Sequence, residues 1–442
     1  MRLRAAGLDA APAEDPPRGV RVVLDARALQ EPDRAPVTAA YLESLLAAYE
    51  ADPLAGESFA LILRSDLDDP TVTLAGLEIS GRRLLPPTHH LRSVALALDP
   101  FLLSGISLGS AWRSRAGGAG GAVYHAVGGG MPFVTRLPLV ATLLDLAPWE
   151  LPAYRRGPLA RFGQRLRGRL LRDAAAVIVG SEAVAAAARR VLHVRRDRLR
   201  VVPFAPRSAF AFWPEGGIDG RAAAASAPGP RVGDTRPERE RLGLPERYLV
   251  YAGRYDARQD LATLLRALQA MTAAGRPDDL AGDPVWPPRI LLVGASPADR
   301  ASLARAAARV GVGDCLAYAP RIPDERLADL VRGARAAILP ARSDATGLPA
   351  IEAIACGTPV VASSVGALPE AVGTAGILVP PLDPERLATA LGTIWTDDGV
   401  HRRLAAVARE RAESERRTWA DVARDTRRIY AEVAAGRGSG AD

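Results

Sequence analysis

The sequence contains no lysine, so all 57 of its basic residues are arginines. It also contains only two cysteines, Cys315 and Cys356. Two cysteines in a chain of this length exclude a disulfide framework and make a reducing cytoplasm the simplest setting. The five histidines lack the spacing of a metal site, and we expect no bound metal; they are His89, His90, His125, His193 and His401.

Long apolar runs are also missing. Residues 1–19 are interrupted by acids and prolines where a signal peptide would be apolar, and we interpret them as a mobile tail. The most apolar stretch, residues 101–112, is too short to cross a bilayer and predicts a core helix. Nothing here predicts a membrane-spanning protein.

What is present points to two globular domains. The 442 residues exceed one ordinary core, and 48% of them are hydrophobic. The net charge of +7 favours anionic partners such as phosphates, nucleic acid or a membrane surface, without choosing among them.

Short uncharged strands alternate with helical patterns in both halves, as in a parallel sheet covered on both faces. In the first half we predict strands at 21–25, 59–63, 122–125, 139–143, 174–179 and 199–202. In the second half we predict them at 248–252, 290–293, 336–339, 359–362 and 377–379. The domain prediction is a tail (1–19), a first domain (20–210), a linker (211–240), a second domain (241–395), C-terminal helices (396–435) and a second tail (436–442).

Three loops at the carboxyl edge of the second sheet hold the candidate binding residues, because ligands of open parallel sheets bind there. In the first loop, Gly253 allows a sharp exit from the strand and Arg254 follows. A guanidinium there suits a diphosphate, to which it donates two parallel hydrogen bonds. The alternative is an arginine paired with a nearby carboxylate at a domain edge.

The second loop runs into the sequence GLPAIEAIACGTPVV. We expect a helix to start after Gly347, with Pro349 as its first residue, so that free N–H groups favour an anion. Glu352 in the first turn either complements the helix dipole or accepts hydrogen bonds from ribose hydroxyls. Asp344, in the loop itself, has the plain interpretation of a solvated turn carboxylate. In the third loop, Gly366 and a helix start near residue 368 form another turn that favours an anion.

The stretches AGRYDARQDL, SDATGLPAIEAIACGTPVVAS and VGALPEAVGTAGILVPPLDPERLA resemble the C-terminal domain of retaining glycosyltransferases of family four. The first half matches more loosely, through VYHAVGGGMPF, ATLLDLAPWELP, AAAVIVGSEAVA and LRVVPFAP. The resemblance implies an α/β protein of the GT-B fold, two Rossmann-like domains that face a central cleft, with a C-terminal helix crossing back to the first domain. It also implies a nucleoside diphosphate sugar held by the second domain, an acceptor held by the first, and neither metal nor cofactor.

The resemblance assigns residues by position. Arg254 would grip the diphosphate and Glu352 the ribose, while Asp344 and Asp145 would line the reacting sugar as catalytic residues. The donor-binding positions are, in chain order, Gly253, Arg254, Gln259, Gly347, Leu348, Glu352, Gly366 and Leu368.

The sequence departs from the family at several of these positions. Gln259 stands where the family has a basic residue, although Arg258 is adjacent and could compensate. Asp344 replaces a longer glutamate, and Leu144 stands where the family has a histidine. The glycine-rich turn expected near residues 35–39 has no glycine. Two hypotheses follow: a metal-independent retaining transferase with shifted contacts, or a non-catalytic subunit that binds a nucleotide sugar or supports an active partner.

Residues 154–172 contain seven arginines and no acid. A surface helix with a solvated basic side is the plain interpretation, and contact with anionic lipid is the alternative. Nucleic acid is not expected, since few aromatic residues lie among the arginines. The basic helical face consists of Arg161, Arg165, Arg169 and Arg172.

Overall fold

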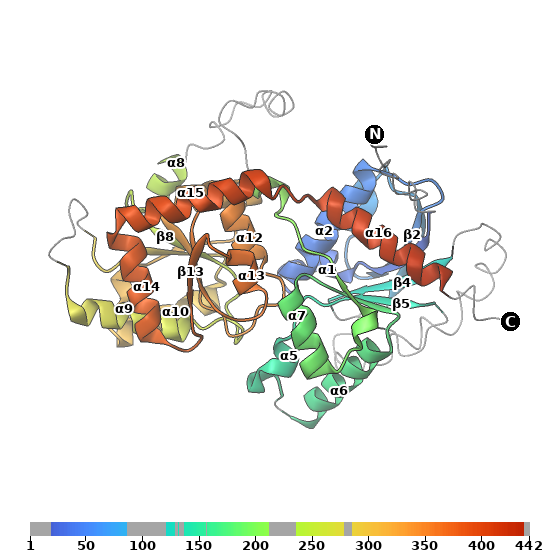
Figure 1. The fold of residues 1–442 in the computed structure, drawn as a ribbon, viewed down its shortest axis with the longest axis horizontal. Coiled ribbons are helices and arrows are strands. Elements are labelled where there is room, and N and C mark those ends of the chain that lie inside the picture. Colours follow the sequence, from blue (N-terminus) through green and yellow to red (C-terminus); the bar gives the residue numbers. More distant parts are fainter. Residues whose placement is uncertain are drawn as a thin grey trace, which may run out of the picture.

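Two parallel β-sheets organise the part of the chain that the computed structural model describes, which comprises residues 19–85, 121–128, 131, 137–155, 157–211, 236–277 and 285–436. Each sheet carries helices on both of its faces, and the two halves lie side by side (Figure 1). The predicted pair of Rossmann-like domains is therefore confirmed.

The first sheet has seven strands in the order β3-β2-β1-β4-β5-β6-β7, and every pair is parallel. Its core strands read as uncharged runs because helices cover both of their faces. The chain changes direction between β1 and β4, and the carboxyl edge at such a switch point is where a ligand fits. The strands are β1 (Arg21–Asp25), β2 (Ser58–Arg64), β3 (Ile79–Leu85), β4 (Ala122–Val127), β5 (Leu139–Thr142), β6 (Ala176–Val179) and β7 (Leu199–Val201).

The second sheet has six parallel strands in the order β10-β9-β8-β11-β12-β13, with its switch point between β8 and β11. The loops after β8, β11 and β12 leave from the carboxyl edge at or beside this switch point. The strands are β8 (Leu249–Ala252), β9 (Ile290–Val293), β10 (Leu316–Ala319), β11 (Ala336–Leu339), β12 (Val360–Ser363) and β13 (Gly376–Val379).

The helices of the first half are α1 (Arg27–Gln30), α2 (Pro36–Ala51), α5 (Ala147–Glu150), α6 (Pro158–Asp173) and α7 (Glu182–Ala187). Ser181 caps α7, its hydroxyl accepting the Val184 N–H at 3.2 Å. The helices of the second half are α8 (Arg236–Arg241), α9 (Leu261–Ala274), α10 (Pro297–Arg309), α11 (Asp324–Gly333), α12 (Leu348–Ala355), α13 (Leu368–Val372), α14 (Pro384–Thr396) and α15 (Asp398–Ser414).

The last helix, α16 (Trp419–Ala435), crosses back to the first half, as the resemblance implies. In Figure 1, α15 runs along the second half and α16 continues over the first. Val422, Ile429 and Tyr430 are buried in the core of the first half. Arg427 forms a buried ion pair with Glu57 at 2.7 Å, so both apolar contacts and charge hold the helix there.

Several predicted segments lie wholly or largely outside the described residues: the tails, the core helix at 101–112 and most of the linker at 211–240. The described end of that linker contains the first residues of α8. Among the helices of the described residues, none is both long enough and apolar enough for a bilayer crossing.

Candidate functional site

The second and third loops of the candidate site are joined through Asp344 and Gly366. The carbonyl oxygen of Asp344 accepts the N–H of Ala367 at 2.9 Å. Gly366 has φ +54°, and a Cβ atom on it would lie 1.7 Å from that carbonyl oxygen. Glycine is therefore required here for both conformation and space.

The Asp344 carboxylate accepts the backbone N–H groups of Thr346 and Gly347 at 2.8 and 2.7 Å. Burial raises its pKa, the nearby charge of Asp145 acts in the same direction, and these two hydrogen bonds oppose them. Asp344 is half-buried rather than solvated, and its carboxylate already occupies the N–H of Gly347 at the helix start. The N–H of Leu348 faces the Thr346 hydroxyl at 3.4 Å.

Helix α12 begins one residue earlier than predicted. Gly347, with φ +63°, is its N-cap, so Leu348 is its first residue and Pro349 its second. The first turn contains no acid, and Glu352 is the fifth residue of the helix rather than the fourth that a start at Pro349 would make it.

Glu352 is held by Arg207, a residue that sequence reasoning missed. Nε and Nη2 of Arg207 donate to the two oxygens of Glu352 at 2.6 and 2.9 Å. Nη1 of Arg207 also binds Asp324 at 2.6 Å. The predicted dipole role of Glu352 is thus replaced by a bidentate ion pair, and a ribose would have to share this carboxylate with a guanidinium.

An alternating chain of charges runs from the loop after β8 to the first half. Arg254 binds Asp256 at 2.9 Å, so its predicted alternative, pairing with a nearby carboxylate, holds in this structure. Arg258 binds the same carboxylate through Nε and Nη2, and its Nη1 reaches Asp145 at 2.6 Å. The two guanidinium groups hold the pKa of Asp256 well below its usual value despite burial.

Gln259 forms an isolated antiparallel bridge with Ala341, which ties the first loop to the second. Its side-chain oxygen is buried, and among the described residues it has no hydrogen-bond partner. Gly253 packs against Tyr251, whose hydroxyl oxygen would lie 2.9 Å from a Cβ atom at position 253.

Further contacts between the halves accompany the Arg258–Asp145 ion pair. The Ser343 hydroxyl donates to Glu150 at 2.6 Å, and the Glu370 carboxylate accepts the N–H groups of Glu182 and Ala183 at 3.1 and 2.5 Å. Apolar packing crosses the same boundary, since Ala345, Leu348 and Ala367 belong to core clusters of the first half. The structure therefore brings the loops of the second half against Asp145.

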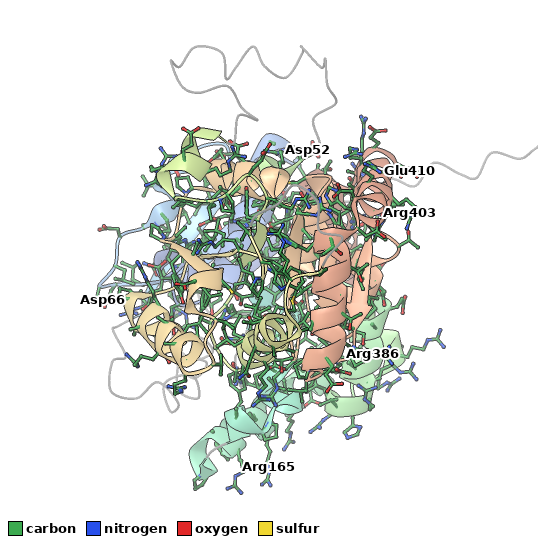
Figure 2. All side chains as sticks on the ribbon, turned by 90° about the vertical axis from the view of Figure 1, so that its left-hand side faces the viewer. Asp52, Asp66, Arg165, Arg386, Arg403 and Glu410 are labelled. Carbon is green, nitrogen blue, oxygen red and sulfur yellow. The ribbon has the colours of Figure 1, made fainter. Side chains whose placement is uncertain are left out.

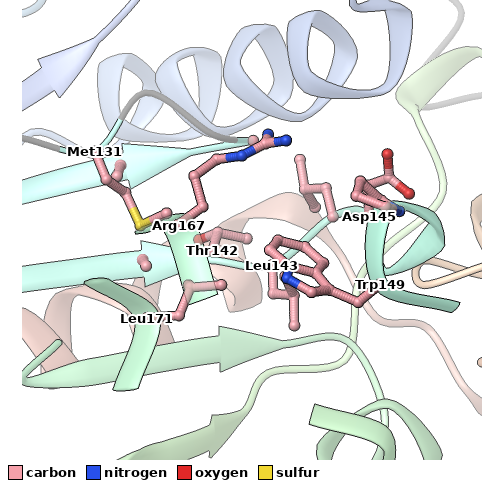
Figure 3. Close-up of a pocket in the computed structure, with 12 residues that line it drawn as sticks. Met131, Thr142, Leu143, Asp145, Trp149, Arg167 and Leu171 are labelled. Atoms are coloured by element: carbon pink, nitrogen blue, oxygen red, sulfur yellow. The ribbon is translucent and has the colours of Figure 1, made fainter. Parts of the chain in front are cut away.

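A pocket opens at the carboxyl ends of β4 and β5 in the first half (Figure 3). Leu144, which stands where the family has a histidine, lines it beside Asp145 and Arg167. Gly128, also in its wall, approaches the start of α2 so closely that a Cβ atom would lie 2.3 Å from the Thr38 hydroxyl oxygen. Arg167 was not singled out from the sequence.

Neither cysteine forms a disulfide. Within the described ranges, no group of three or more His, Cys, Asp or Glu side chains is arranged to hold a metal ion.

Two family models match this chain. One, described as "Glycosyl transferases group 1", matches residues 246–397, and the other, "Glycosyltransferase Family 4", matches residues 79–204. Among curated proteins, a D-inositol 3-phosphate glycosyltransferase of Streptomyces griseus is 36% identical over 256 residues, which are 55% of this chain and 48% of that protein. Another, from Acidothermus cellulolyticus, is 31% identical over 280 residues, 61% of this chain and 56% of that protein. The match thus spans about half the length of these relatives.

Solved glycosyltransferase structures share the fold. Sucrose-phosphate synthase from Thermosynechococcus elongatus superposes with a TM-score of 0.66 at 23% identity, covering 94% of this chain and all of that chain. Anabaena HepE in complex with UDP gives a TM-score of 0.61 at 18% identity, over 93% of this chain and all of that chain. The two matched segments and these two sheets together place the chain among the family four glycosyltransferases of the GT-B fold.

Proposed function

We propose that the chain transfers a sugar from a nucleoside diphosphate sugar to an acceptor. The observation that carries this proposal is the pair of guanidinium groups, Arg254 and Arg258, in the loop after β8. They share one carboxylate of their own half, Asp256, and the second carboxylate bound to Arg258, Asp145, comes from the first half. Within the second half, the loop at the switch point thus has two cations and one anion. A diphosphate brings the complementary charge to that place.

Each loop then has a role in the proposed reaction. Arg254 and Arg258 stabilise the departing diphosphate, so Arg258 supplies the charge that Gln259 lacks. Glu352, oriented by Arg207, accepts hydrogen bonds from the ribose. Asp344 and Asp145 line the reacting sugar, which is transferred with retention, and the leaving group helps to deprotonate the acceptor. We propose that no metal takes part, because arginines neutralise the diphosphate.

The comparisons support a nucleotide-sugar substrate. The curated relatives are named for glycosyl transfer to D-inositol 3-phosphate, and the HepE structure contains UDP. For this chain we propose a saccharide or a lipid-linked saccharide as the acceptor.

The purified protein can be tested with UDP-, GDP- and ADP-sugars in the presence of EDTA, by thermal shift and by nucleotide release. We expect one nucleotide to raise the melting temperature and its sugar to release nucleotide once an acceptor is present. Arg254→Ala should lower release about a hundredfold, as for loss of one donor to a developing anion. The exposed Arg266 on α9 provides the control, Arg266→Ala. The proposal would be contradicted if the Arg254 variant released nucleotide as fast as the unmodified chain, or if no nucleotide shifted the melting temperature.

The second candidate function is a non-catalytic subunit that binds a nucleotide sugar or supports an active partner. It is favoured by the self-contained contacts of the site, since Asp344 binds its own loop and Glu352 binds Arg207. A thermal shift with a nucleotide sugar but no release with any acceptor would support this function instead.

We further propose that the chain works in the cytoplasm and docks peripherally on the anionic inner face of the membrane through α6. This helix has four exposed arginines, Arg161, Arg165, Arg169 and Arg172. Phe162, which follows Arg161 in the sequence, is 60% exposed. Figure 2 shows Arg165 at the lower extremity of the molecule, pointing away from it. Basic residues around an exposed aromatic ring suit an anionic lipid surface.

Flotation with liposomes tests this docking. We expect recovery with vesicles containing phosphatidylglycerol and little recovery with pure phosphatidylcholine. Replacing both Phe162 and Arg165 with Ser should abolish flotation, whereas replacing the exposed Arg386 and Arg403 on α14 and α15 should not. Equal recovery with both kinds of vesicle would reject the docking surface.

A further inference from the structure

The pocket of the first half contains a guanidinium group that the proposed transfer has not used. It lies among the ends of β4 and β5, helix α5 and the middle of α6, and Arg167 of α6 extends into it (Figure 3). Gly128 and Thr142 also line it. This is the carboxyl edge beside the switch point of the first sheet, where a ligand of an open parallel sheet binds.

Arg167 makes no hydrogen bond or ion pair with any of the described residues. The carboxylate that lines the same pocket, Asp145, is engaged elsewhere, since it accepts the Ala147 N–H at 2.9 Å and binds Arg258 at 2.6 Å. The guanidinium lies over the Trp149 ring, whose centroid is 5.7 Å from Cζ. Burial lowers the pKa of Arg167, and the charge of Asp145 opposes this only in part.

A partly buried cation without an ion pair is unfavourable unless a ligand brings the missing charge. The other arginines around the site are paired: Arg207 with Glu352, Arg254 with Asp256, and Arg258 with Asp256 and Asp145. The pocket therefore differs from its surroundings in offering a charge that none of the described residues neutralises.

We propose that Arg167 binds an anionic group of the acceptor, a phosphate or a carboxylate, in this pocket. The inference rests on the proposed transfer, because it assigns the substrate class of the acceptor. The pocket has a volume of about 40 Å³, a few times the roughly 10–15 Å³ that one water molecule needs. It thus admits one small functional group and leaves the sugar or polyol outside.

The position of the pocket assigns the anion to the acceptor rather than to the donor. All of its lining residues belong to the first half, whereas the diphosphate loops belong to the second. Asp145 lies in the pocket wall and also binds Arg258 of the diphosphate loop. An acceptor anchored by its anion at Arg167 would therefore have the rest of its body directed towards the donor side.

The experiment uses Trp149 as an internal reporter, because its ring contacts Arg167. Tryptophan fluorescence of the full chain is titrated with inositol 3-phosphate, with glucuronate and with neutral inositol, and Trp149→Phe identifies the part of the signal from this pocket. We expect saturable binding of the phosphate, the carboxylate or both, and none of inositol. Arg167→Gln should weaken that binding tenfold or more, as for a lost charge-assisted hydrogen bond.

Arg190→Gln, at an exposed position of the first half outside the pocket, should bind the probes as the unmodified chain does. The thermal shift with nucleotide should be kept in both variants, which shows that each is folded and that the donor half is intact. Equal affinity for inositol and inositol 3-phosphate, no binding of either acid, or unchanged affinity in Arg167→Gln would overturn the proposal. Failure of nucleotide binding in the unmodified chain would instead reject the proposed transfer.

Discussion

Arg258 shows how the loop after β8 brings a guanidinium group to Asp145 although the next residue, Gln259, is neutral. Asp256 accepts the Arg258 N–H at 3.0 Å through its side chain and the Gln259 N–H at 3.0 Å through its carbonyl group. This turn folds the Arg258 side chain over Asp256 and towards Asp145, while Gln259 pairs with Ala341. An extended loop would have sent the two side chains to opposite sides, and the turn removes that constraint.

Glu352 gives a residue-scale prediction for the donor site. Its oxygens each retain a lone pair while Arg207 holds them, so they can still accept ribose hydroxyls. We expect Glu352→Gln to weaken nucleoside diphosphate binding about tenfold, through loss of a charged acceptor. It should also reduce the preference for the ribonucleotide over its 2′-deoxy form. Both affinities can be measured by calorimetry, with the exposed Glu325→Gln as control. An unchanged preference would remove Glu352 from the ribose site.

Residues that belong to a motif could be located from the sequence, whereas residues that act through distant partners could not. Gly347 is at a helix start and Gly366 at a tight turn, as expected. Arg207 and Glu352 are 145 residues apart, and no local spacing predicts their ion pair. The burial of Asp344 was missed for the same reason, because it depends on the packing of two loops. The roles of the site residues in catalysis stay predictions.

At the scale of elements, helix α13 makes a contact with the other half that its sequence does not predict. It is a five-residue helix, and its start was interpreted as a turn that favours an anion. In the structure its acid, Glu370, instead accepts N–H groups at the start of α7 in the other half. Ser181 satisfies a third N–H of α7, so this helix start is capped from both halves. The loop that carries Gly366 is thereby fixed against the first half.

Most strands could be predicted from the sequence because they are buried on both faces and therefore uncharged. β3 was missed because it lies at the edge of its sheet and contains Gly81, Arg82 and Arg83, which interrupt the apolar pattern. β10 was missed because its sequence, LAYA, contains no β-branched residue and two alanines, which are uncommon in strands. Helix α6 is continuous despite Gly163 and Gly168, since packing of one face overrides the low helix propensity of glycine.

At the scale of the whole molecule, the C-terminal segment joins the two halves, and its last helix completes a polar network in the core of the first. The His125 ring of β4 lies 2.7 Å from the Thr142 hydroxyl and 2.6 Å from the hydroxyl of Tyr430 in α16. Tyr49 of α2 donates to Tyr430 at 3.4 Å. Two sheet strands and two helices are thus joined through one fully buried imidazole, which has a donor or an acceptor at each ring nitrogen.

This network predicts how the stability of the molecule depends on pH. Burial lowers the pKa of His125 from 6.5 to about 3 in the folded chain, so between these values the unfolded chain binds a proton that the folded chain does not. The contribution of His125 to the free energy of unfolding is therefore complete above the unfolded pKa. It falls as the pH drops below that value, by about 2 kcal/mol between about pH 7 and about pH 5.

The variant His125→Gln, which keeps a donor and an acceptor but does not titrate, should remove this part of the pH dependence. The control is His193→Asn at an exposed position where φ is +57°. Urea unfolding at the two pH values measures the difference, and His401, whose pKa burial also lowers, contributes equally to every variant. If His125→Gln loses as much stability on acidification as the unmodified chain, protonation of the buried His125 ring does not cause the loss of stability at low pH.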